Sequence, residues 1–356
     1  MKVAIIGAGL SGLSCAHELI RHGIIPTVFE RKSFVGEVLD LPAVILDMFN
    51  MPISRPLKYL KKKFELDIRP NFPLKEMIMH TANKDLTVKS NLGYIIKRGK
   101  YRDSIESQIM QSINIPINYN SYVDIKDIKN DFEHIVVATG TPNVAKDLGV
   151  FTSTFECNVR IATVLGDFKV NTIIAWFNTA FAKTAYAFLV PNSEKDARLV
   201  LTVNNIYPNE LDYYWKKFLQ IANIDYNIRN IIDLTHNVGF VNPLHHKKLL
   251  FCGNAGGFID DIFGFGSMKA MMSGVLAAKC IIEKRNYTKV AQELTEDIDQ
   301  LHKFRQTIDK FNNDDFDNLL AILSLPGIKQ YVYNNPFFKA TQGVRLAQIY
   351  NIFKGK

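Results

Sequence analysis

Cysteine is scarce in this sequence. Its 356 residues include only Cys15, Cys157, Cys252 and Cys280, which are widely scattered and form no CxxC or CxxxC pair. This pattern argues against a disulfide framework and a cysteine-based structural zinc site, and it favours a reducing compartment. We therefore expect a cytoplasmic protein that holds no metal.

Long apolar runs are also missing. Charges or glycines interrupt every run before it reaches the roughly 18 apolar residues that a membrane-spanning helix needs. The apolar first stretch contains Gly7, Gly9 and Gly12 and leads into charged residues rather than a small-residue cleavage site, so we expect no removable export signal. The sequence also lacks internal repeats and low-complexity tracts, which argues against a solenoid and a disordered tail.

The composition is that of an ordinary globular protein. The chain is 47% hydrophobic and 22% charged, so it can bury a large core and is long enough for about two domains. Its formal net charge of +8 would suit an anionic ligand or a membrane surface, although lysine-rich solvated faces produce the same balance.

A glycine motif lies between a predicted strand at residues 2–6 and a predicted helix at residues 10–21. In the motif GAGLSG, Gly7 permits a tight turn, Gly9 lets the backbone approach a pyrophosphate, and Gly12 lets the helix pack closely on the sheet. The first amides of the helix and its dipole then favour phosphate binding. The alternative is an ordinary structural glycine turn.

A second predicted strand, residues 27–30, ends in Glu30. An acidic residue at this spacing from a GxGxxG motif can accept hydrogen bonds from an adenosine ribose. The strand, turn, helix, strand and terminal acid therefore predict a dinucleotide site, which can hold either FAD or NAD.

Two later stretches resemble parts of a known flavoprotein family. HIVVATG, residues 134–140, reads as a buried strand that ends in a small-residue turn, and residues 249–281 read as a strand (249–252), a loop (253–266) and a helix from Ser267 to about Glu283. Together with the glycine motif they resemble FAD-dependent oxidoreductases of the geranylgeranyl reductase type, within the p-hydroxybenzoate hydroxylase class.

The resemblance implies an α/β fold with a Rossmann-like FAD-binding domain, made of a parallel sheet with helices and a β-meander. It also implies that Gly253 and Asn254 meet the ribityl chain and pyrophosphate. Gly264, Gly266, Ser267 and Met268 would approach the isoalloxazine ring. Asn254 stands where the family usually has Asp, which removes a charge but keeps a hydrogen-bonding group. A helix N-terminus can stabilise negative charge on a reduced flavin, although glycines before a helix are also common in ordinary loops.

Arg98 and Val123 complete the predicted cofactor site. Residues 93–110 read as a strand, a turn and an amphipathic helix, and the resemblance places Arg98 beside the flavin. A surface arginine is the alternative, because basic residues are common at strand ends. The predicted strand at residues 115–123 resembles the family strand that leads to the adenine, held through backbone groups at Val123. The cofactor-binding residues that we predict are Gly7, Gly9, Leu10, Ser11, Gly12, Glu30, Arg31, Arg98, Val123, Gly140, Gly253, Asn254, Gly264, Gly266, Ser267 and Met268.

The middle of the chain predicts a β-sheet-based substrate domain, with strands at residues 172–177, 186–190 and 197–203. AYAFLVP, residues 185–191, resembles an aromatic and proline strand motif that lines the substrate cavity in geranylgeranyl reductases, with Phe188 where the family tends to have Trp. Trp176, Tyr186 and Phe188 are therefore the predicted substrate-lining residues. Aromatic residues at strand spacing are also ordinary core residues.

These patterns divide the chain into four predicted parts. The first part of the FAD-binding domain covers residues 1–150 with an insertion at about 35–95, the substrate domain 151–246, the second part of the FAD-binding domain 247–284, and a helical C-terminal region 285–356, broken at Pro326 and Pro336. The segment 344–356 mixes apolar and basic residues. We expect it to pack as a helix on the cofactor domain, and a membrane-surface contact is the alternative.

We therefore expect an FAD-dependent oxidoreductase that reduces a carbon–carbon double bond of an isoprenoid or other apolar substrate through flavin N5. The partner would be an apolar small molecule or lipid and no nucleic acid, with cytoplasmic or peripheral membrane localisation. No second GxGxxG follows, so electrons would come from transient NAD(P)H contact or a small redox protein. Tyr186, His245 and His246 are proton-donor candidates by residue type alone. The alternatives are a flavin-dependent monooxygenase and a non-catalytic dinucleotide-binding or redox-sensing protein.

Overall fold

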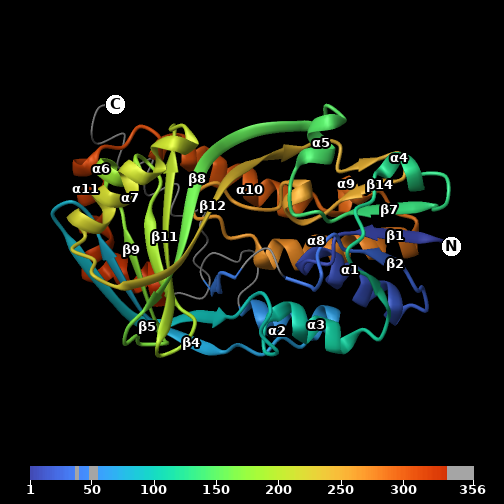
Figure 1. Cartoon of the computed structure of the whole chain (residues 1–356), viewed down its shortest axis with the longest axis horizontal. Coiled ribbons are helices and arrows are strands. Elements are labelled where there is room, and N and C mark those ends of the chain that lie inside the picture. Colours follow the sequence, from blue (N-terminus) through green and yellow to red (C-terminus); the bar gives the residue numbers. More distant parts are fainter. Residues whose placement is uncertain (37–39, 48–54, 335–356) are drawn as a thin grey trace.

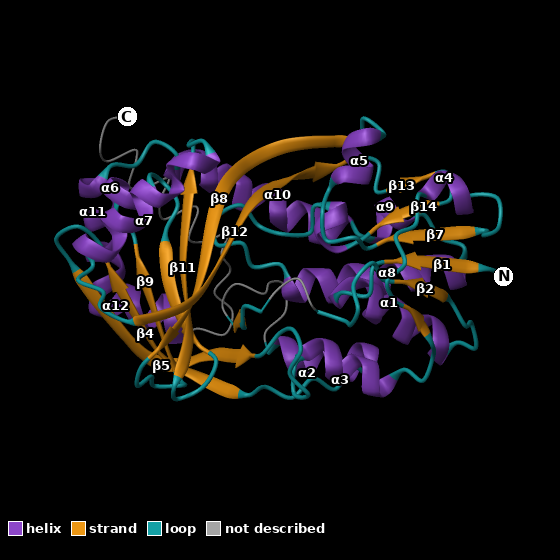
Figure 2. Cartoon of the chain, in the orientation of Figure 1, coloured by secondary structure: helices purple, strands orange, loops and turns teal. Residues whose placement is uncertain are grey.

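The computed structural model describes residues 1–36, 40–47 and 55–334. Two sheets dominate the molecule (Figure 1), a six-stranded sheet that contains the N-terminal strand and an eight-stranded sheet at the opposite end. Figure 2 shows helices packed around both sheets, including the C-terminal helices against the eight-stranded sheet.

The strands alternate with helices along most of the chain. Their bounds are β1 Val3–Ile6, β2 Thr27–Phe29, β3 Ala43–Leu46, β4 Phe72–His80, β5 Asp85–Ile96, β6 Ile117–Asn118, β7 His134–Val137, β8 Phe151–Leu165, β9 Thr172–Trp176, β10 Ala187–Pro191, β11 Asp196–Asn204, β12 Asn227–Val241, β13 His245–His246 and β14 Leu249–Phe251.

The helices include two that follow glycine-rich loops, α1 and α8. The α-helices are α1 Leu10–Arg21, α2 Pro56–Phe64, α3 Ile105–Ser112, α4 Ile125–Ile128, α5 Asn143–Asp147, α6 Thr179–Ala182, α7 Leu211–Ile221, α8 Ser267–Glu283, α9 Tyr287–Val290, α10 Gln292–Ile308, α11 Asn313–Ser324 and α12 Pro326–Asn334. Short 3-10 helices cover Pro208–Glu210 (η1) and Gly253–Gly256 (η2).

The six-stranded sheet has the order β13-β14-β7-β1-β2-β6. All its neighbours pair in parallel except β13 and β14. Its central strand, Val3–Ile6, is buried along its whole length, as expected for a parallel strand covered on both faces. The carboxyl ends of β1, β2, β7 and β14 therefore meet at one edge, where open α/β sheets bind their ligands.

Helices α1 and α8 pack tightly against each other beside this sheet (Figure 2). Their close approach depends on small residues, because a Cβ added to Gly274 of α8 would lie 2.0 Å from the backbone oxygen of Ser11 in α1. The N-termini of both helices consequently lie near the carboxyl edge of the sheet, although α8 is separated from α1 by most of the chain.

The eight-stranded sheet has the order β12-β8-β11-β10-β9-β4-β5-β3. Strands β3, β4 and β5, which fall in the insertion predicted at residues 35–95, pair with strands from the predicted substrate domain, since β4 runs parallel to β9. The long strands β8 and β12 are paired along their length and curve from this sheet toward α5 (Figure 1). The boundaries of the four predicted parts stay predictions.

The α/β fold class is confirmed: a Rossmann-like parallel sheet, a second sheet and a helical C-terminal region are all present. Three details differ. The predicted strand at 115–123 is reduced to β6, because Pro116 and the turn after Asn118 leave only two paired residues. The strands β4, β8 and β12 of the eight-stranded sheet were missed. No three-stranded meander forms in the six-stranded sheet among the described residues, where β13 and β14 make its only antiparallel pair.

The C-terminal helices pack on the eight-stranded sheet. Leu320 of α11 and Val332 of α12 share a core with Leu74 of β4. The helical region is interrupted at Pro326 as predicted, because α11 ends at Ser324 and Pro326 begins α12, as its fixed φ and missing N–H allow at a first helical turn. Pro336 and the segment 344–356 lie outside the described residues. Within the described part of the chain, no helix has the length and hydropathy needed to span a membrane.

Candidate functional site: a cavity between the two sheets

A cavity of about 850 Å³ extends from the carboxyl edge of the six-stranded sheet to the face of the eight-stranded sheet. One part is lined by backbone-rich loops at the ends of β1, β2, β7 and β14, and we call this part the cradle. The other part is lined by side chains of β8, β10, β11 and β12, and we call it the chamber. The volume falls within the range of small-molecule and cofactor sites.

The three glycines of the first loop have different surroundings. Gly7 has φ +103°, and a Cβ there would lie 2.4 Å from the Ala138 backbone oxygen. A Cβ on Gly12 would lie 1.9 Å from the oxygen of Gly7, whereas a Cβ on Gly9 would meet nothing within 4 Å. Gly7 and Gly12 therefore hold the loop in shape, and Gly9 leaves open space at the start of α1.

The N-terminus of α1 has the character of an anion site. Gly9 caps the helix without a side-chain hydrogen bond, and the first turn contains no acidic residue. The free amides and the positive end of the helix dipole therefore face the cavity without an internal counterion. Leu10 and Ser11 of this turn line the cavity with Gly7 and Gly9.

Glu30 lies directly after β2 and is held in place by two backbone amides. Its Oε2 accepts a hydrogen bond from Ala8 N at 2.8 Å, and its Oε1 accepts one from Lys32 N at 2.9 Å. A carboxylate has about four acceptor sites, so Glu30 retains capacity for ligand hydroxyls at the edge of the cavity.

The second glycine loop meets the first one. Gly253 has φ +58°, and a Cβ there would lie 2.6 Å from Ser11 Oγ. The Gly253 amide donates to Ser273 Oγ of α8 at 2.9 Å, which ties the loop to that helix. The Asn254 side-chain amide makes no hydrogen bond within the described residues and lines the cavity, so both its donor and its acceptor are available to a ligand.

Asp260 shapes the loop that leads into α8. Its carboxylate accepts hydrogen bonds from the backbone amides of Ile262, Phe263 and Phe265 at 3.1, 2.7 and 2.8 Å. Burial raises the pKa of this carboxyl, while nearby Lys269 opposes the shift. The loop then reaches Gly264 and Gly266, and the first turn of α8 has neither a side-chain cap nor an acidic residue. A second helix N-terminus without a side-chain cap thus faces the cavity.

Arg98 lies in the cavity wall, held by a buried acid. Its Nε lies 2.5 Å from Oε1 of Glu106, whose side chain is 0% exposed. The two Nη groups of Arg98 have no partner among the described residues. Arg98 is therefore a positioned cation with free donors rather than a solvated surface arginine.

The remaining cradle residues lie at its outer end. Val123 lines the cavity beside Tyr122, which is 86% exposed. Gly140 has φ +74°, a conformation that glycine adopts without strain, and the exposed Arg31 follows Glu30. Tyr122 was missed because nothing in its sequence context distinguishes it from a surface tyrosine.

The cavity brings together nearly all of the predicted cofactor residues. Gly7, Gly9, Leu10, Ser11, Glu30, Arg31, Arg98, Val123, Gly140, Gly253, Asn254, Gly264, Gly266 and Ser267 line it, whereas Gly12 and Met268 do not. Gly12 lies behind Gly7, and Met268 is buried in the core of the six-stranded sheet domain. Both support the wall rather than form it.

The chamber is mainly apolar. Residues that are paired across β8 and β12, such as Val159 with Leu234 and Phe155 with Val238, share the face that lines it. Tyr186 and Phe188 also line it, stacked with ring centroids 5.4 Å apart. The Tyr186 hydroxyl donates to the Phe263 backbone oxygen at 2.5 Å, and burial raises the pKa of this phenol well above its usual value.

The prediction that Trp176 lines the substrate site is wrong. Its ring stacks on His80 and meets Phe218 of α7 edge-on, with centroids 5.7 and 5.4 Å away, so it belongs to a separate core. His245 and His246 are wrong as proton-donor candidates, since they form the edge strand β13 and do not line the cavity. Neighbouring residues in a strand point to opposite faces, and sequence alone did not tell which face met the ligand.

Several polar chamber residues were missed by sequence reasoning, among them His236 and Asp261. His236 of β12 lines the chamber, and its Nε2 is buried without a hydrogen-bond partner. Burial lowers the pKa of this imidazole, which keeps it neutral near neutral pH. Asp261 also lies in the wall, and His302 Nδ1 of α10 lies 2.6 Å from its Oδ2.

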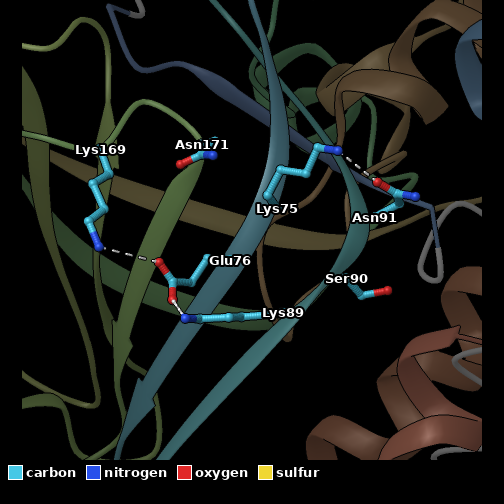
Figure 3. Close-up of a pocket in the computed structure, with 7 residues that line it drawn as sticks. All are labelled: Lys75, Glu76, Lys89, Ser90, Asn91, Lys169 and Asn171. Atoms are coloured by element: carbon cyan, nitrogen blue, oxygen red, sulfur yellow. Dashed lines mark hydrogen bonds and ion pairs between the residues drawn. The ribbon is translucent and has the colours of Figure 1, made fainter.

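A second hollow lies on the eight-stranded sheet and has a different character (Figure 3). Its lining residues are Lys75, Glu76, Lys89, Ser90, Asn91, Lys169 and Asn171, and none of them lines the larger cavity. Lys89 and Lys169 lie 3.4 and 4.0 Å from the Glu76 carboxylate and are largely exposed. These surface pairs leave no buried polar group for a ligand, so we place the functional site in the larger cavity.

The residues of the cradle fit FAD. Gly9 and the N-terminus of α1, which has no side-chain cap, suit a pyrophosphate. The carboxylate of Glu30, held by two amides, suits a ribose. The positive end of the α8 dipole suits the negative charge of a reduced flavin ring. The cavity continues into the chamber, which leaves room for a substrate beyond the cofactor.

The glycine loop matches a known family at the sequence level. The family described as NAD(P)-binding Rossmann-like domain matches residues 5–39. This match covers the cradle segment from the end of β1 through α1 and β2, and it leaves the rest of the chain unassigned.

Solved structures resemble nearly the whole chain. A geranylgeranyl bacteriochlorophyll reductase-like protein from Thermoplasma acidophilum has a TM-score of 0.74 and 14% identity, covering 97% of this chain and 98% of that chain. A flavoprotein/dehydrogenase from Cytophaga hutchinsonii has a TM-score of 0.65 and 15% identity, covering 99% and 100%. A putative FAD-containing monooxygenase from Photorhabdus luminescens has a TM-score of 0.59 and 15% identity, covering 87% and 98%. The chain has the fold of these flavoproteins.

Proposed function

We propose that this protein is an FAD-dependent oxidoreductase that reduces a carbon–carbon double bond of an isoprenoid or other apolar substrate. The observation that carries the proposal is one continuous cavity that joins two glycine loops to an apolar sheet face. A bound FAD supplies a hydride equivalent at its N5 atom, which this chain's own side chains cannot supply.

The chain binds and orients the reactants in this proposal. The α1 N-terminus and Gly9 hold the pyrophosphate, Glu30 holds the ribose, and Asn254 bonds the ribityl hydroxyls. The α8 N-terminus and the Nη groups of Arg98 stabilise negative charge near the ring. The apolar strands of the chamber exclude water from the reacting carbon atoms.

The substrate in this proposal is an apolar small molecule or lipid, and the protein is cytoplasmic, at a membrane surface when the substrate is a lipid. The electron donor is NAD(P)H in transient contact or a small redox protein. Tyr186 is a positioning residue rather than the proton donor, because its hydroxyl hydrogen is already donated to Phe263.

Hydroxylation of an apolar or aromatic substrate with oxygen is the second candidate. It is favoured by the likeness to the putative FAD-containing monooxygenase. A non-catalytic dinucleotide-binding or redox-sensing role is the third candidate, supported by Asn254, where the resembling reductases usually carry Asp.

Product analysis under controlled oxygen distinguishes these functions. The FAD-loaded protein is reduced under anaerobic conditions and mixed with polyprenyl alkenes, and the products are analysed by mass spectrometry. Double-bond reduction predicts a product with two added hydrogens and no oxygen requirement. The Gly9→Ala variant serves as the control with weakened cofactor binding. Product that forms only with stoichiometric oxygen uptake would contradict the reductase and favour hydroxylation. No turnover despite bound FAD would favour the non-catalytic role.

A further inference from the structure

Charges are divided unevenly along the cavity. The basic residues among its described lining are Arg31, Lys32, Arg98 and Lys126, and all four belong to the cradle. The chamber and the loop that closes it contribute the acids Asp260 and Asp261 and no lysine or arginine. Arg305 lies behind the wall, where its guanidinium is bonded to Asp309 and stacks over Phe155. A negatively charged substrate would therefore find no cation in the chamber.

His236 is the polar feature that stands out in the chamber. It is paired with Cys157 across β8 and β12, on the same face as the apolar pairs on either side. Neither of its ring nitrogens has a hydrogen-bond partner among the described residues, and Nε2 is buried. An unpaired buried polar group costs free energy, so a ligand that supplies the missing partner would bind more tightly.

Other polar groups of the chamber are less suited to anchor a ligand. The Tyr186 hydroxyl is bonded to Phe263, and the Asp260 carboxylate is bonded to three backbone amides. Asp261 is paired with His302 through Oδ2, and its Oδ1 is buried without a partner among the described residues. This carboxylate oxygen can accept a hydrogen bond from a hydroxyl but offers no donor to a carbonyl. Thr202 adds a hydroxyl on β11, opposite Val159, and its contribution can be tested separately. Burial keeps His236 neutral, so it presents one N–H donor and one acceptor.

We propose that the substrate is an uncharged apolar molecule with one hydrogen-bonding group, a hydroxyl or carbonyl, and that His236 binds this group. This inference rests on the proposed function, and it narrows the apolar substrates to those without a phosphate or carboxylate. A phosphorylated substrate would place its charge beside Asp260 and Asp261. Lys269, the cation near Asp260, is already paired with Asp297, so the desolvation of the phosphate is costly.

Four probes with the same ten-carbon chain test the inference: geraniol, geranic acid, geranyl diphosphate and the hydrocarbon 2,6-dimethylocta-2,6-diene. Calorimetric titration into the FAD-loaded protein should give about tenfold tighter binding for geraniol than for the hydrocarbon or either anion, as expected for one hydrogen bond in a buried site. Nitrogen-15 NMR of the His236 imidazole should show a shift with geraniol and none with the hydrocarbon.

Variants separate His236 from the rest of the wall. His236→Phe should remove the preference for geraniol over the hydrocarbon while hydrocarbon binding persists. His245→Phe, on the edge strand outside the cavity, should leave the preference unchanged, and Thr202→Val should reduce it less than twofold. These variants are compared only after circular dichroism confirms that each one is folded.

Three results would overturn the inference: tighter binding of the diphosphate or the acid, an unchanged preference in His236→Phe, or no binding of any probe to the folded, FAD-loaded protein. Failure of the proposed function is a distinct result. A protein that binds FAD and the probes but reduces no alkene refutes the proposed function, whereas the calorimetric ranking of the probes does not depend on turnover and still tests His236.

Discussion

The cradle and the chamber are built by different means. The cradle is made largely of backbone, with two glycine loops and two helix N-termini held a short distance apart by Gly12, Gly253 and Gly274. The chamber is made of side chains from the four strands β8, β10, β11 and β12. Backbone walls recognise a group common to many ligands, such as a pyrophosphate, whereas side-chain walls determine which substrate fits.

This difference predicts how mutations in each region act. A change in the cradle acts through backbone geometry, so it alters folding or cofactor binding. A change in the chamber acts through one side chain and should spare the cofactor. The predictions below test that separation, from the largest expected effect to the smallest.

Gly12→Ala should have the largest effect, and it should act on folding. A Cβ at this position would lie 1.9 Å from the Gly7 backbone oxygen and 3.2 Å from Ile5 Cγ2, so strand and helix would have to separate. We expect the free energy of unfolding to fall by about 3 kcal/mol or more, as for severe overpacking, measured by chemical denaturation. A variant with wild-type stability would show that the close contact between α1 and β1 is not required.

Gly9→Ala should act on the cofactor alone. Its Cβ meets no atom within 4 Å, and its φ of −82° suits alanine, so the apoprotein should unfold as the wild type does. The methyl group would occupy the approach to the pyrophosphate, and we expect FAD affinity to fall by about a hundredfold, roughly 2.7 kcal/mol. Fluorescence titration of the apoprotein with FAD measures the loss. Full FAD affinity would contradict the role of Gly9 in the cradle.

Tyr186→Phe should lower the stability of the protein without reducing FAD binding in the cradle. The variant removes the hydrogen bond that the Phe263 oxygen accepts from the Tyr186 hydroxyl, which should lower the free energy of unfolding by about 1–3 kcal/mol. Tyr207→Phe is the control, because Tyr207 is 77% exposed and should change stability by less than about 0.5 kcal/mol. Equal stability of both variants would mean that the Tyr186 hydrogen bond does not hold the loop before α8. Loss of FAD in Tyr186→Phe would contradict the claim that changes in the chamber leave cofactor binding unchanged.

His236→Gln should have a small effect that depends on pH. Burial lowers the pKa of His236 from its usual 6.5 in the folded protein. In the unfolded chain His236 keeps its usual pKa and binds a proton more readily than in the folded chain, so the wild type loses stability as the pH falls through this range. The unfolding temperature of His236→Gln, compared with that of the wild type, should therefore rise progressively as the pH is lowered from about 7 to about 5. A difference that stays constant, or that grows toward alkaline pH, would show that His236 is not buried as a neutral group.

The two regions also differ in how far the sequence predicted them. The glycine loops were predicted because a turn, a helix start and Glu30 are close together in the chain, and their chemistry is expressed locally. His236 and Trp176 were not placed correctly, because the face that a strand residue occupies depends on pairing between distant strands. β12 pairs with β8 only after the chain returns from α7, and β3–β5 join the same sheet from an earlier segment.

The central claim is that the cradle holds FAD, and the cofactor content of the purified protein tests it most directly. The visible spectrum is recorded, the protein is denatured, and the supernatant is assayed for FAD and FMN. The account predicts oxidised-flavin bands, release of FAD rather than FMN, and restored absorbance when the apoprotein is given FAD. A folded, colourless protein that takes up no added FAD would contradict the account.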